Sequence, residues 1–211
     1  MTLTEQLKEY ADNSVKRHPG AAQDTMREAI EALVATNILD GATKTGDQFP
    51  NFTLPNAKGN DISLETLLKE GNVVLTFYRG GWCPYCNIAL QALQNTLPEI
   101  KAKGAQLIAI TPETPDNSLT TQEKNELGFE VLTSENNELA RSLGLVYQLP
   151  NDLVALYNKF GIDLIQSQGN EANELPIAAT YIIGQDGKVT YHYLAEDYKL
   201  RADPLDIIAA L

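Results

Sequence analysis

Two cysteines are the residues of this chain whose type and spacing best suit chemistry. Cys83 and Cys86 are the only cysteines among 211 residues, and they enclose a proline and a tyrosine in the sequence CPYC. An apolar run at 73–78 precedes them and is followed by the turn-forming sequence RGG. We therefore expect a strand to end near Tyr78 and a helix to begin near Cys83.

This arrangement suits thiol redox chemistry. A helix N-terminus offers free backbone N–H groups and the positive end of the helix dipole to a thiolate, and a thiol one turn further on can close a disulfide. Attack of Cys83 on a peroxide would give a sulfenic acid that Cys86 traps. Attack on a disulfide would give a mixed disulfide that the same Cys86 releases. The spacing leaves both chemistries open.

Residues around the two cysteines are candidates for supporting roles. Arg79 would lower the pKa of the Cys83 thiol if it lies beside the sulfur, and is otherwise a solvated loop charge. Trp82 shields the site or simply packs in the core, and Tyr85 is either an exposed contact for a partner or structural. Pro84 joins these two as a supporting or substrate-binding residue. We expect a depressed pKa for Cys83 and not for Cys86.

A zinc half-site is the other common use of two cysteines at this spacing. Such a site needs two more ligands. The chain has no second cysteine pair, and His18 and His192 lie in distant segments without ligand spacing. We therefore expect no metal, and no other cofactor because no flavin or nucleotide motif occurs. Glu113 follows an apolar run, where a carboxylate could approach the site, but the simpler expectation is a solvated loop side chain.

Composition narrows the functional class. The formal net charge is −12 and no basic patch occurs, which argues against nucleic-acid or anionic-membrane partners. The first residues lack a signal-peptide pattern, and no apolar run approaches the ~18 residues of a membrane span. Two cysteines at this spacing are typical of a catalytic pair in a reducing compartment. We expect a cytoplasmic protein.

The chain divides into an extension and a main domain. Residues 1–45 predict a helical hairpin, with one amphipathic helix over 3–16 and a second that ends near Gly41. Its apolar stripe must pack on the main domain or on another subunit, so the stripe is also a candidate homodimer surface. The stripe comprises Leu3, Leu7, Tyr10, Ala11, Val15, Met26, Ile30, Leu33, Val34 and Ile38.

The main domain, residues 46–211, predicts alternating strands and helices. A short β-hairpin is followed by a helix over 64–69. Strands over 73–78, 106–110 and 129–132 then alternate with helices that begin at 83 and span 118–127 and 136–143. A β-hairpin from 180–183 to 188–193 and a helix over 204–210 complete the chain. Pro98 should kink or divide the cysteine helix. Residues 153–157 suit a helix and 166–174 a loop. This order predicts an α/β domain with a mixed central sheet flanked by helices.

Specific segments resemble a known family. The sequence FYRGGWCPYC at 77–86 resembles the active-site turn of thioredoxin-fold proteins, and its CPYC matches the glutaredoxin motif. The opening pattern from Gly46 to Leu54 and the closing hairpin ATYIIGQDGKV are similar to those of the peroxiredoxin (alkyl hydroperoxide reductase/thiol-specific antioxidant, AhpC/TSA) family. The resemblance covers roughly residues 46–210.

The resemblance implies a thioredoxin-like fold and an antioxidant thiol peroxidase. Cys83 would attack a peroxide, Cys86 would resolve the product, and Arg79 would assist. Electrons would come from an external thiol reductant, the thioredoxin or the glutathione system. The alternatives are a thiol–disulfide oxidoreductase that acts on disulfide substrates, and a redox sensor without turnover.

Two positions depart from the family pattern. Peroxiredoxins carry Pro-x-x-x-Thr-x-x-Cys before the attacking cysteine, and this chain has Thr76 and Gly80 at the matching positions. The arginine that the family places on the facing strand, and the cis-proline of thioredoxins, correspond here to Ala178, with Pro176 two residues earlier. The missing threonine and arginine favour the thiol–disulfide alternative.

Overall fold

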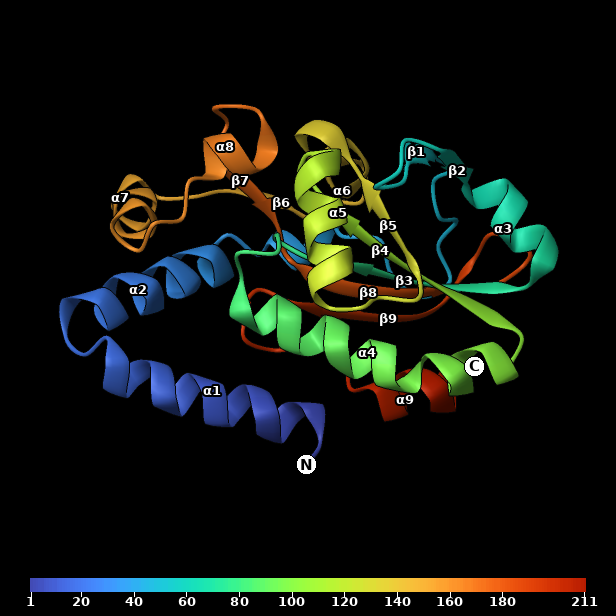
Figure 1. The fold of residues 1–211 in the computed structure, drawn as a ribbon, viewed down its shortest axis with the longest axis horizontal. Helices are drawn as coiled ribbons and strands as arrows, with labels where there is room; N and C mark the ends of the chain where they lie inside the picture. Colours follow the sequence, from blue (N-terminus) through green and yellow to red (C-terminus); the bar gives the residue numbers. More distant parts are fainter.

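Five strands form the central sheet, in the order β5-β4-β3-β8-β9. The computed structural model describes residues 1–211 (Figure 1). Strands β3 (Asn72–Phe77), β4 (Ala105–Thr111) and β5 (Glu130–Thr133) are parallel, whereas β8 (Ala178–Ile183) and β9 (Val189–Ala195) add antiparallel pairs. The predicted mixed sheet of an α/β domain is confirmed.

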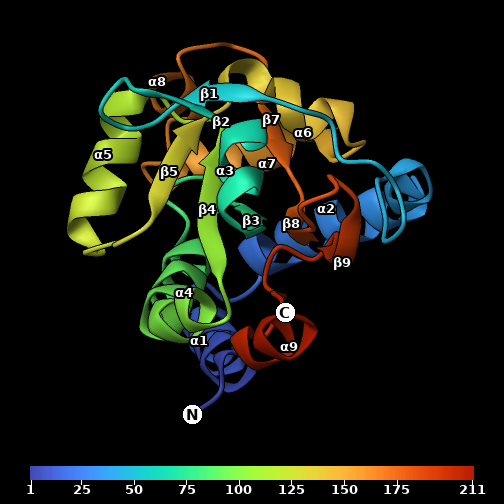
Figure 2. The ribbon, with the colours of Figure 1, turned by 90° about the vertical axis from the view of Figure 1, so that its right-hand side faces the viewer.

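Helices cover both faces of this sheet. Helices α4 (Pro84–Ala102), α9 (Pro204–Ala210) and α1 (Leu3–Arg17) pack with one face, which includes Val74 and Ala109. Helices α3 (Leu64–Glu70) and α6 (Glu138–Ser142) pack with the other face, which includes Leu75 and Ile110. Because neighbouring residues of a strand point to opposite faces, the continuous apolar runs of β3 and β4 supply both cores. Figure 2 shows α4, α1 and α9 together below the sheet.

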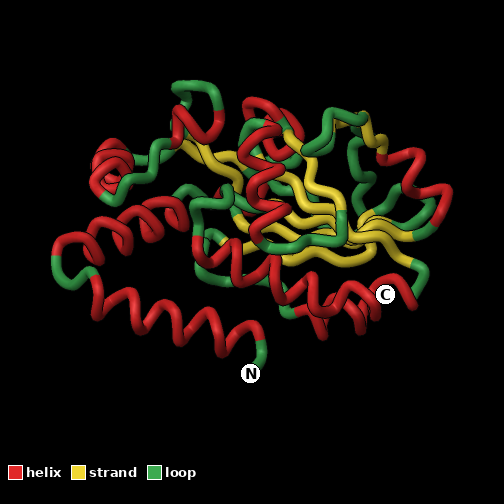
Figure 3. The backbone as a smooth tube through the Cα atoms, viewed as in Figure 1, coloured by secondary structure: helices red, strands yellow, loops and turns green.

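The N-terminal helical hairpin packs against its own chain. A capping box between Thr2 and Glu5 starts α1, which contacts α4. Helix α2 (Ala21–Ala35), which ends before a short 3₁₀ turn at Ile38–Gly41, contacts α7 (Asn151–Lys159). The hairpin therefore lies beside the main domain in Figure 3, as one of the two predicted arrangements requires.

The apolar stripe of this hairpin is only partly covered. Leu3 and Leu7 are buried with α4 and α9, and Leu33 is buried against the other core. Val15 and Val34 remain 52% and 48% exposed, so the main domain does not cover this part of the stripe, and its role as a homodimer surface stays a prediction. These two valines lie on the side of their helices that faces solvent.

Both predicted β-hairpins are present. Strands β1 (Thr53–Pro55) and β2 (Asp61–Ser63) pair antiparallel, and the Ser63 side chain caps α3 by accepting from the N–H of Thr66 at 3.2 Å. The turn between β8 and β9 contains Gly187 with φ +79°, a conformation that glycine adopts without steric cost.

Other boundaries differ from expectation. Helix α4 is continuous through Pro98, with Leu97 and Ile100 buried on either side of it, so the predicted division does not occur, while the alternative of a kink stays a prediction. Helix α5 (Pro115–Lys124) begins earlier than predicted, at a proline suited to a first helical turn. A 3₁₀ turn over Glu135–Asn137 replaces the start of the helix expected from 136.

The segment between α6 and β8 was the least predictable. It contains α7, a short helix α8 (Leu164–Gln168) where a loop was expected, and a small sheet of β6 (Val146–Gln148) and β7 (Glu174–Pro176). Strands of three residues carry too few alternations to be read from a sequence. No helix of the structure has the length and apolar character that a membrane crossing needs.

Candidate active site

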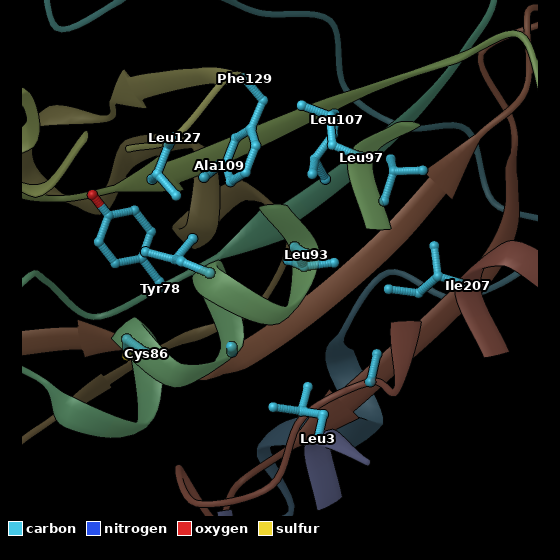
Figure 4. Packing of buried hydrophobic residues seen from close by; sticks show 14 of the residues in the cluster. Leu3, Tyr78, Cys86, Leu93, Leu97, Leu107, Ala109, Leu127, Phe129 and Ile207 are labelled. Atoms are coloured by element: carbon cyan, nitrogen blue, oxygen red, sulfur yellow. The ribbon is translucent and has the colours of Figure 1, made fainter. Parts of the chain in front are cut away.

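Cys83 lies where the sequence places it, between a strand and a helix. The chain leaves β3 at Phe77, and Cys83 is the N-cap residue of α4, with Pro84 in the first turn. The N–H of Cys83 donates to the carbonyl of Gly80, and the N–H of Cys86 donates to the carbonyl of Cys83, each at 3.1 Å. Both thiols are free and buried. Figure 4 shows Cys86 on α4 within the apolar cluster beneath the sheet.

Arg79 is a buried cation rather than a solvated loop charge. Its guanidinium lies 4.4 Å from the ring centroid of Tyr198 and 4.9 Å from that of Trp82, and it donates to the Tyr157 hydroxyl. It forms no ion pair with a carboxylate, and its Nε has no hydrogen-bond partner. Its charge is therefore available to the neighbouring cysteine sulfurs.

A second arginine, which sequence reasoning missed, lies against the other sulfur. Nη2 of Arg201 is 3.2 Å from Cys86 Sγ, and Nη1 donates to the carbonyls of Tyr198 and Leu200. Arg201 comes from the segment between β9 and α9 and, like Arg79, pairs with no carboxylate. No local pattern marks it, because only the folded chain brings it to α4.

The two thiols differ in the direction of their pKa shifts, although both are buried. Burial and a hydrogen bond to Cys86 raise the pKa of Cys83. Burial also opposes charge on Cys86, but the hydrogen bond from Cys83 and the charges of Arg201 and Arg79 lower its pKa to about 5. The predicted order, with the depressed pKa on Cys83, is therefore wrong for the resting pair. The lower pKa of the two therefore belongs to Cys86, which is the thiol that favours the charged form.

The surroundings of Gly80 explain why the family's threonine is absent from this position. Gly80 has φ +149°, and a Cβ there would lie 2.3 Å from Nε1 of Trp82 and 2.9 Å from Oε1 of Glu113. The indole ring therefore occupies the space that a threonine side chain would need. Thr76 contributes no group to the pocket, because its hydroxyl is buried 3.2 Å from that of Thr180.

The facing strand carries no charged group at the site. Ala178 opens β8 and is buried, and Pro176 ends β7 in a chain without cis peptide bonds. The two arginines that face the cysteines come instead from the loop before Cys83 and from the segment before α9. The fold thus supplies cations to both sulfurs from positions other than the one expected from the family.

Glu113 is buried, so the expectation of a solvated carboxylate is wrong. Its Oε2 accepts from the N–H of Gly81 at 2.8 Å, and its Oε1 accepts from the Ser167 hydroxyl at 3.0 Å. Burial raises the pKa of this carboxyl group. Glu113 ties the loop before the cysteines to α8 and thereby fixes the backbone that presents Cys83.

A pocket of about 420 Å³ opens onto Cys83. Cys86 does not line it, so Cys83 is the sulfur that a substrate meets first. The main domain and the N-terminal hairpin both contribute to its wall, which consists of Tyr10, Ser14, His18, Met26, Arg79, Trp82, Cys83, Pro84, Tyr85, Tyr157, Phe160, Ile162 and Tyr198.

The aromatic residues of the motif belong to this wall. Trp82 packs against Tyr157 with ring centroids 5.6 Å apart. Tyr85 is buried rather than exposed, with its ring 5.1 Å from Tyr10 and 5.5 Å from Tyr198 in edge-on contacts. The interpretation of Tyr85 as an exposed partner contact is therefore wrong. Sequence reasoning missed Tyr157 and Tyr198, which are remote in sequence from the cysteines.

The two histidines have separate contacts, and only His18 lines the pocket of Cys83. The His18 ring packs on Phe160 with centroids 4.7 Å apart, and Nδ1 of His192 lies 2.7 Å from the Thr45 hydroxyl. No group of three or more histidine, cysteine or acidic side chains is arranged to hold a metal ion.

Comparison with known proteins gives consistent matches. The profile of the AhpC/TSA family matches residues 45–192. The chain is 29% identical over 159 residues to peroxiredoxin Q, chloroplastic, of Triticum aestivum, an alignment that covers 75% of this chain and 63% of that protein. It is 28% identical over 102 residues to peroxiredoxin Bcp of Escherichia coli K12, covering 48% of this chain and 65% of that one. The chain thus spans about two thirds of the length of these relatives.

Solved structures agree with the fold. The crystal structure of peroxidoxin BcpB from Mycobacterium tuberculosis aligns with a TM-score of 0.63 at 20% identity, covering 80% of this chain and 96% of that one. The α/β fold of this chain is therefore the fold of that peroxidoxin. The family match begins at residue 45 and leaves the helical hairpin outside it.

Proposed function

Because the chain belongs to the AhpC/TSA family, we propose that it is a thiol peroxidase in which Cys83 attacks a peroxide and Cys86 resolves the oxidised product. One observation carries this assignment. Cys83 lines a pocket that Cys86 does not reach, while Cys86 lies one helical turn behind it with Arg201 at its sulfur. The accessible sulfur is suited to attack and the enclosed one to resolution.

The first step requires the proton of the Cys83 thiol to move to Cys86. Cys86 has the lower pKa of the pair, so it is the thiol that favours the charge before the reaction begins. Transfer of the proton makes Cys83 the thiolate, with Arg79 nearby to stabilise it. The thiolate attacks the distal oxygen of ROOH, the O–O bond breaks, and RO⁻ leaves as the alcohol ROH after taking a proton.

The second step closes the disulfide. Once its proton has passed to the leaving alkoxide, the Cys86 thiolate attacks the sulfur of the Cys83 sulfenic acid. An S–S bond forms and hydroxide leaves, which becomes water with a proton from solvent. The two thiols have then lost two electrons to the peroxide, and an external dithiol or glutathione must return them by thiol–disulfide exchange.

The thiol–disulfide oxidoreductase remains the second candidate. Gly80 and Ala178 stand where the family carries its threonine and arginine, and the CPYC sequence matches glutaredoxins. In that function the same Cys83 would attack a disulfide and Cys86 would release it. We further propose that the protein works in a reducing compartment, the cytoplasm, where a free cysteine pair can cycle.

Trapping the intermediate tests the assignment. The Cys86→Ser variant, treated with one equivalent of hydrogen peroxide and a sulfenic-acid probe, should carry the probe on Cys83 by peptide mass spectrometry. The matched Cys83→Ser variant should carry little or none on Cys86, because that sulfur does not reach the pocket. A probe found mainly on Cys86, or on neither sulfur, would overturn the assignment.

A further inference from the structure

We propose that the N-terminal hairpin makes this site selective for hydroperoxides that carry an apolar group of about the size of an aromatic ring. The inference rests on the thiol peroxidase function proposed above and names its substrate class. It concerns residues that lie before the family match, which begins at residue 45.

The hairpin forms one side of the pocket above Cys83. Tyr10, Ser14 and His18 come from α1 and its end, and Met26 comes from α2. The opposite side comes from the main domain. The hairpin thus closes one side of the space in front of Cys83, whose residue is buried in the full chain.

The hairpin is held in place by specific contacts on the pocket's rim. The ring of Tyr10 meets Tyr85 edge-on at 5.1 Å, and the Tyr198 hydroxyl lies 3.5 Å from Sδ of Met26. His18 packs on Phe160 at 4.7 Å between ring centroids. Together with the buried Leu3 and Leu7, these contacts fix α1 and α2 on the domain.

Pocket size and chemistry indicate the ligand class. About 420 Å³ falls within the range of about 300–1,000 Å³ that small-molecule sites occupy. Hydrogen peroxide is little larger than water, whose share of liquid volume is about 30 Å³, and would leave most of this space unused. Aromatic and apolar side chains dominate the wall, and such faces attract an apolar ring through offset or edge-on contacts.

The main domain contributes the one arginine and the one thiol of the pocket. Arg79 and Cys83 are both buried, and no acidic side chain lines the pocket. A hydroperoxide group would thus be directed toward Cys83 while its apolar substituent contacts Tyr10, Tyr85 and Met26. This geometry favours a substrate with one polar and one apolar end.

The test compares two peroxides in the oxidative half-reaction. Pre-reduced protein is mixed with cumene hydroperoxide or with hydrogen peroxide, and the second-order rate constant is followed through Trp82 fluorescence, the only tryptophan signal of the chain. We expect the ratio of the two rate constants, cumene hydroperoxide over hydrogen peroxide, to fall about tenfold in Tyr10→Ala and in Ser14→Phe. Tenfold corresponds to about 1.4 kcal/mol of contact with the apolar group. Tyr10→Ala removes wall area, and Ser14→Phe fills the space.

Matched variants control for effects on folding. Tyr10→Phe keeps the ring and should keep the ratio, and Val15→Phe adds the same bulk on the exposed side of α1 and should leave both rate constants unchanged. If wild type reacts with hydrogen peroxide but the ratio does not change in Tyr10→Ala and Ser14→Phe, the selectivity proposal fails while the peroxidase function stands. If neither peroxide reacts faster than with a free thiolate, the peroxidase function itself fails.

Discussion

Nη2 of Arg201 lies 3.2 Å from the sulfur of Cys86, although the two residues are 115 positions apart in the sequence. The contact joins the segment before α9 to the first turn of α4. It places a cation behind the cysteine pair, whereas Arg79 lies in front of it in the pocket. Neither arginine is neutralised by a carboxylate, so both positive charges favour a thiolate in the cysteine pair.

Removal of Arg201 should raise the pKa of Cys86. We expect Arg201→Met, in a Cys83→Ser background, to shift the titration of Cys86 upward by about one unit or more, since a buried cation at hydrogen-bond distance stabilises the thiolate. The ultraviolet absorbance of the thiolate as a function of pH measures it. Arg201→Lys should retain part of the effect because it keeps the charge. An unchanged titration in Arg201→Met would show that the contact does not act on the sulfur.

The oxidation rate should depend on pH through the same group. Because the pKa of Cys86 is lowered to about 5, the charged pair dominates above that pH and is lost as the pH falls through it. We expect a nearly constant rate constant with peroxide between about pH 6 and 8, and a fall of about tenfold per pH unit below about pH 5. Stopped-flow measurements of the rate constant across this pH range test the expected dependence. A midpoint near the ordinary cysteine pKa of about 8.5 would contradict the arrangement of charge.

Substitution of Arg79 should lower the rate constant with peroxide more than it lowers the stability of the fold. Arg79→Met keeps an apolar stem between the rings of Trp82 and Tyr198 but removes the charge next to Cys83. We expect the rate constant with hydrogen peroxide to fall about tenfold or more, since one pKa unit of stabilisation is worth about 1.4 kcal/mol. Arg79→Lys should recover part of the rate. Equal rates in all three proteins, with intact thermal unfolding, would remove Arg79 from the reaction.

A side chain at Gly80 should not be tolerated. Gly80→Ala would force its Cβ to 2.3 Å from Nε1 of Trp82, so we expect a loss of about 1–3 kcal/mol in the free energy of unfolding. Gly59→Ala is the matched control, because Gly59 also has positive φ, +81°, but nothing lies within 4 Å of its Cβ position. The control should lose only the backbone strain of about 1 kcal/mol. Denaturant unfolding measures both, and equal losses would mean that the Trp82 clash relaxes.

Sequence reasoning was most successful where the signal is local. The end of β3, the turn before Cys83 and the proline that starts α4 all lie within one short segment, and each has a known conformational preference. Apolar runs likewise predicted the sheet, because strands buried on both faces need continuous apolar residues.

What the sequence could not show depends on contacts between distant segments. Arg201, Tyr157 and Tyr198 reach the cysteines only through the folded chain. The predicted order of the two thiol pKa values missed two causes: the hydrogen bond from Cys83 lowers the pKa of Cys86, and so does the charge of Arg201, which no pattern near α4 reveals. Glu113 was expected in solvent because a loop position alone does not indicate that Gly81 and Ser167 would enclose it.

In the proposed reaction, Cys83 attacks peroxide directly and then forms a disulfide with Cys86. Its most direct measurement is the stopped-flow reaction of the reduced protein, in separate experiments, with hydrogen peroxide, with cumene hydroperoxide and with a mixed disulfide of glutathione, followed through Trp82. We expect at least one peroxide to react much faster than with a free thiolate of the same pKa, with a second phase for disulfide closure that is absent in Cys86→Ser. Peroxide rates no faster than those of a free thiolate, beside rapid exchange with the mixed disulfide, would contradict the account and establish a thiol–disulfide oxidoreductase instead.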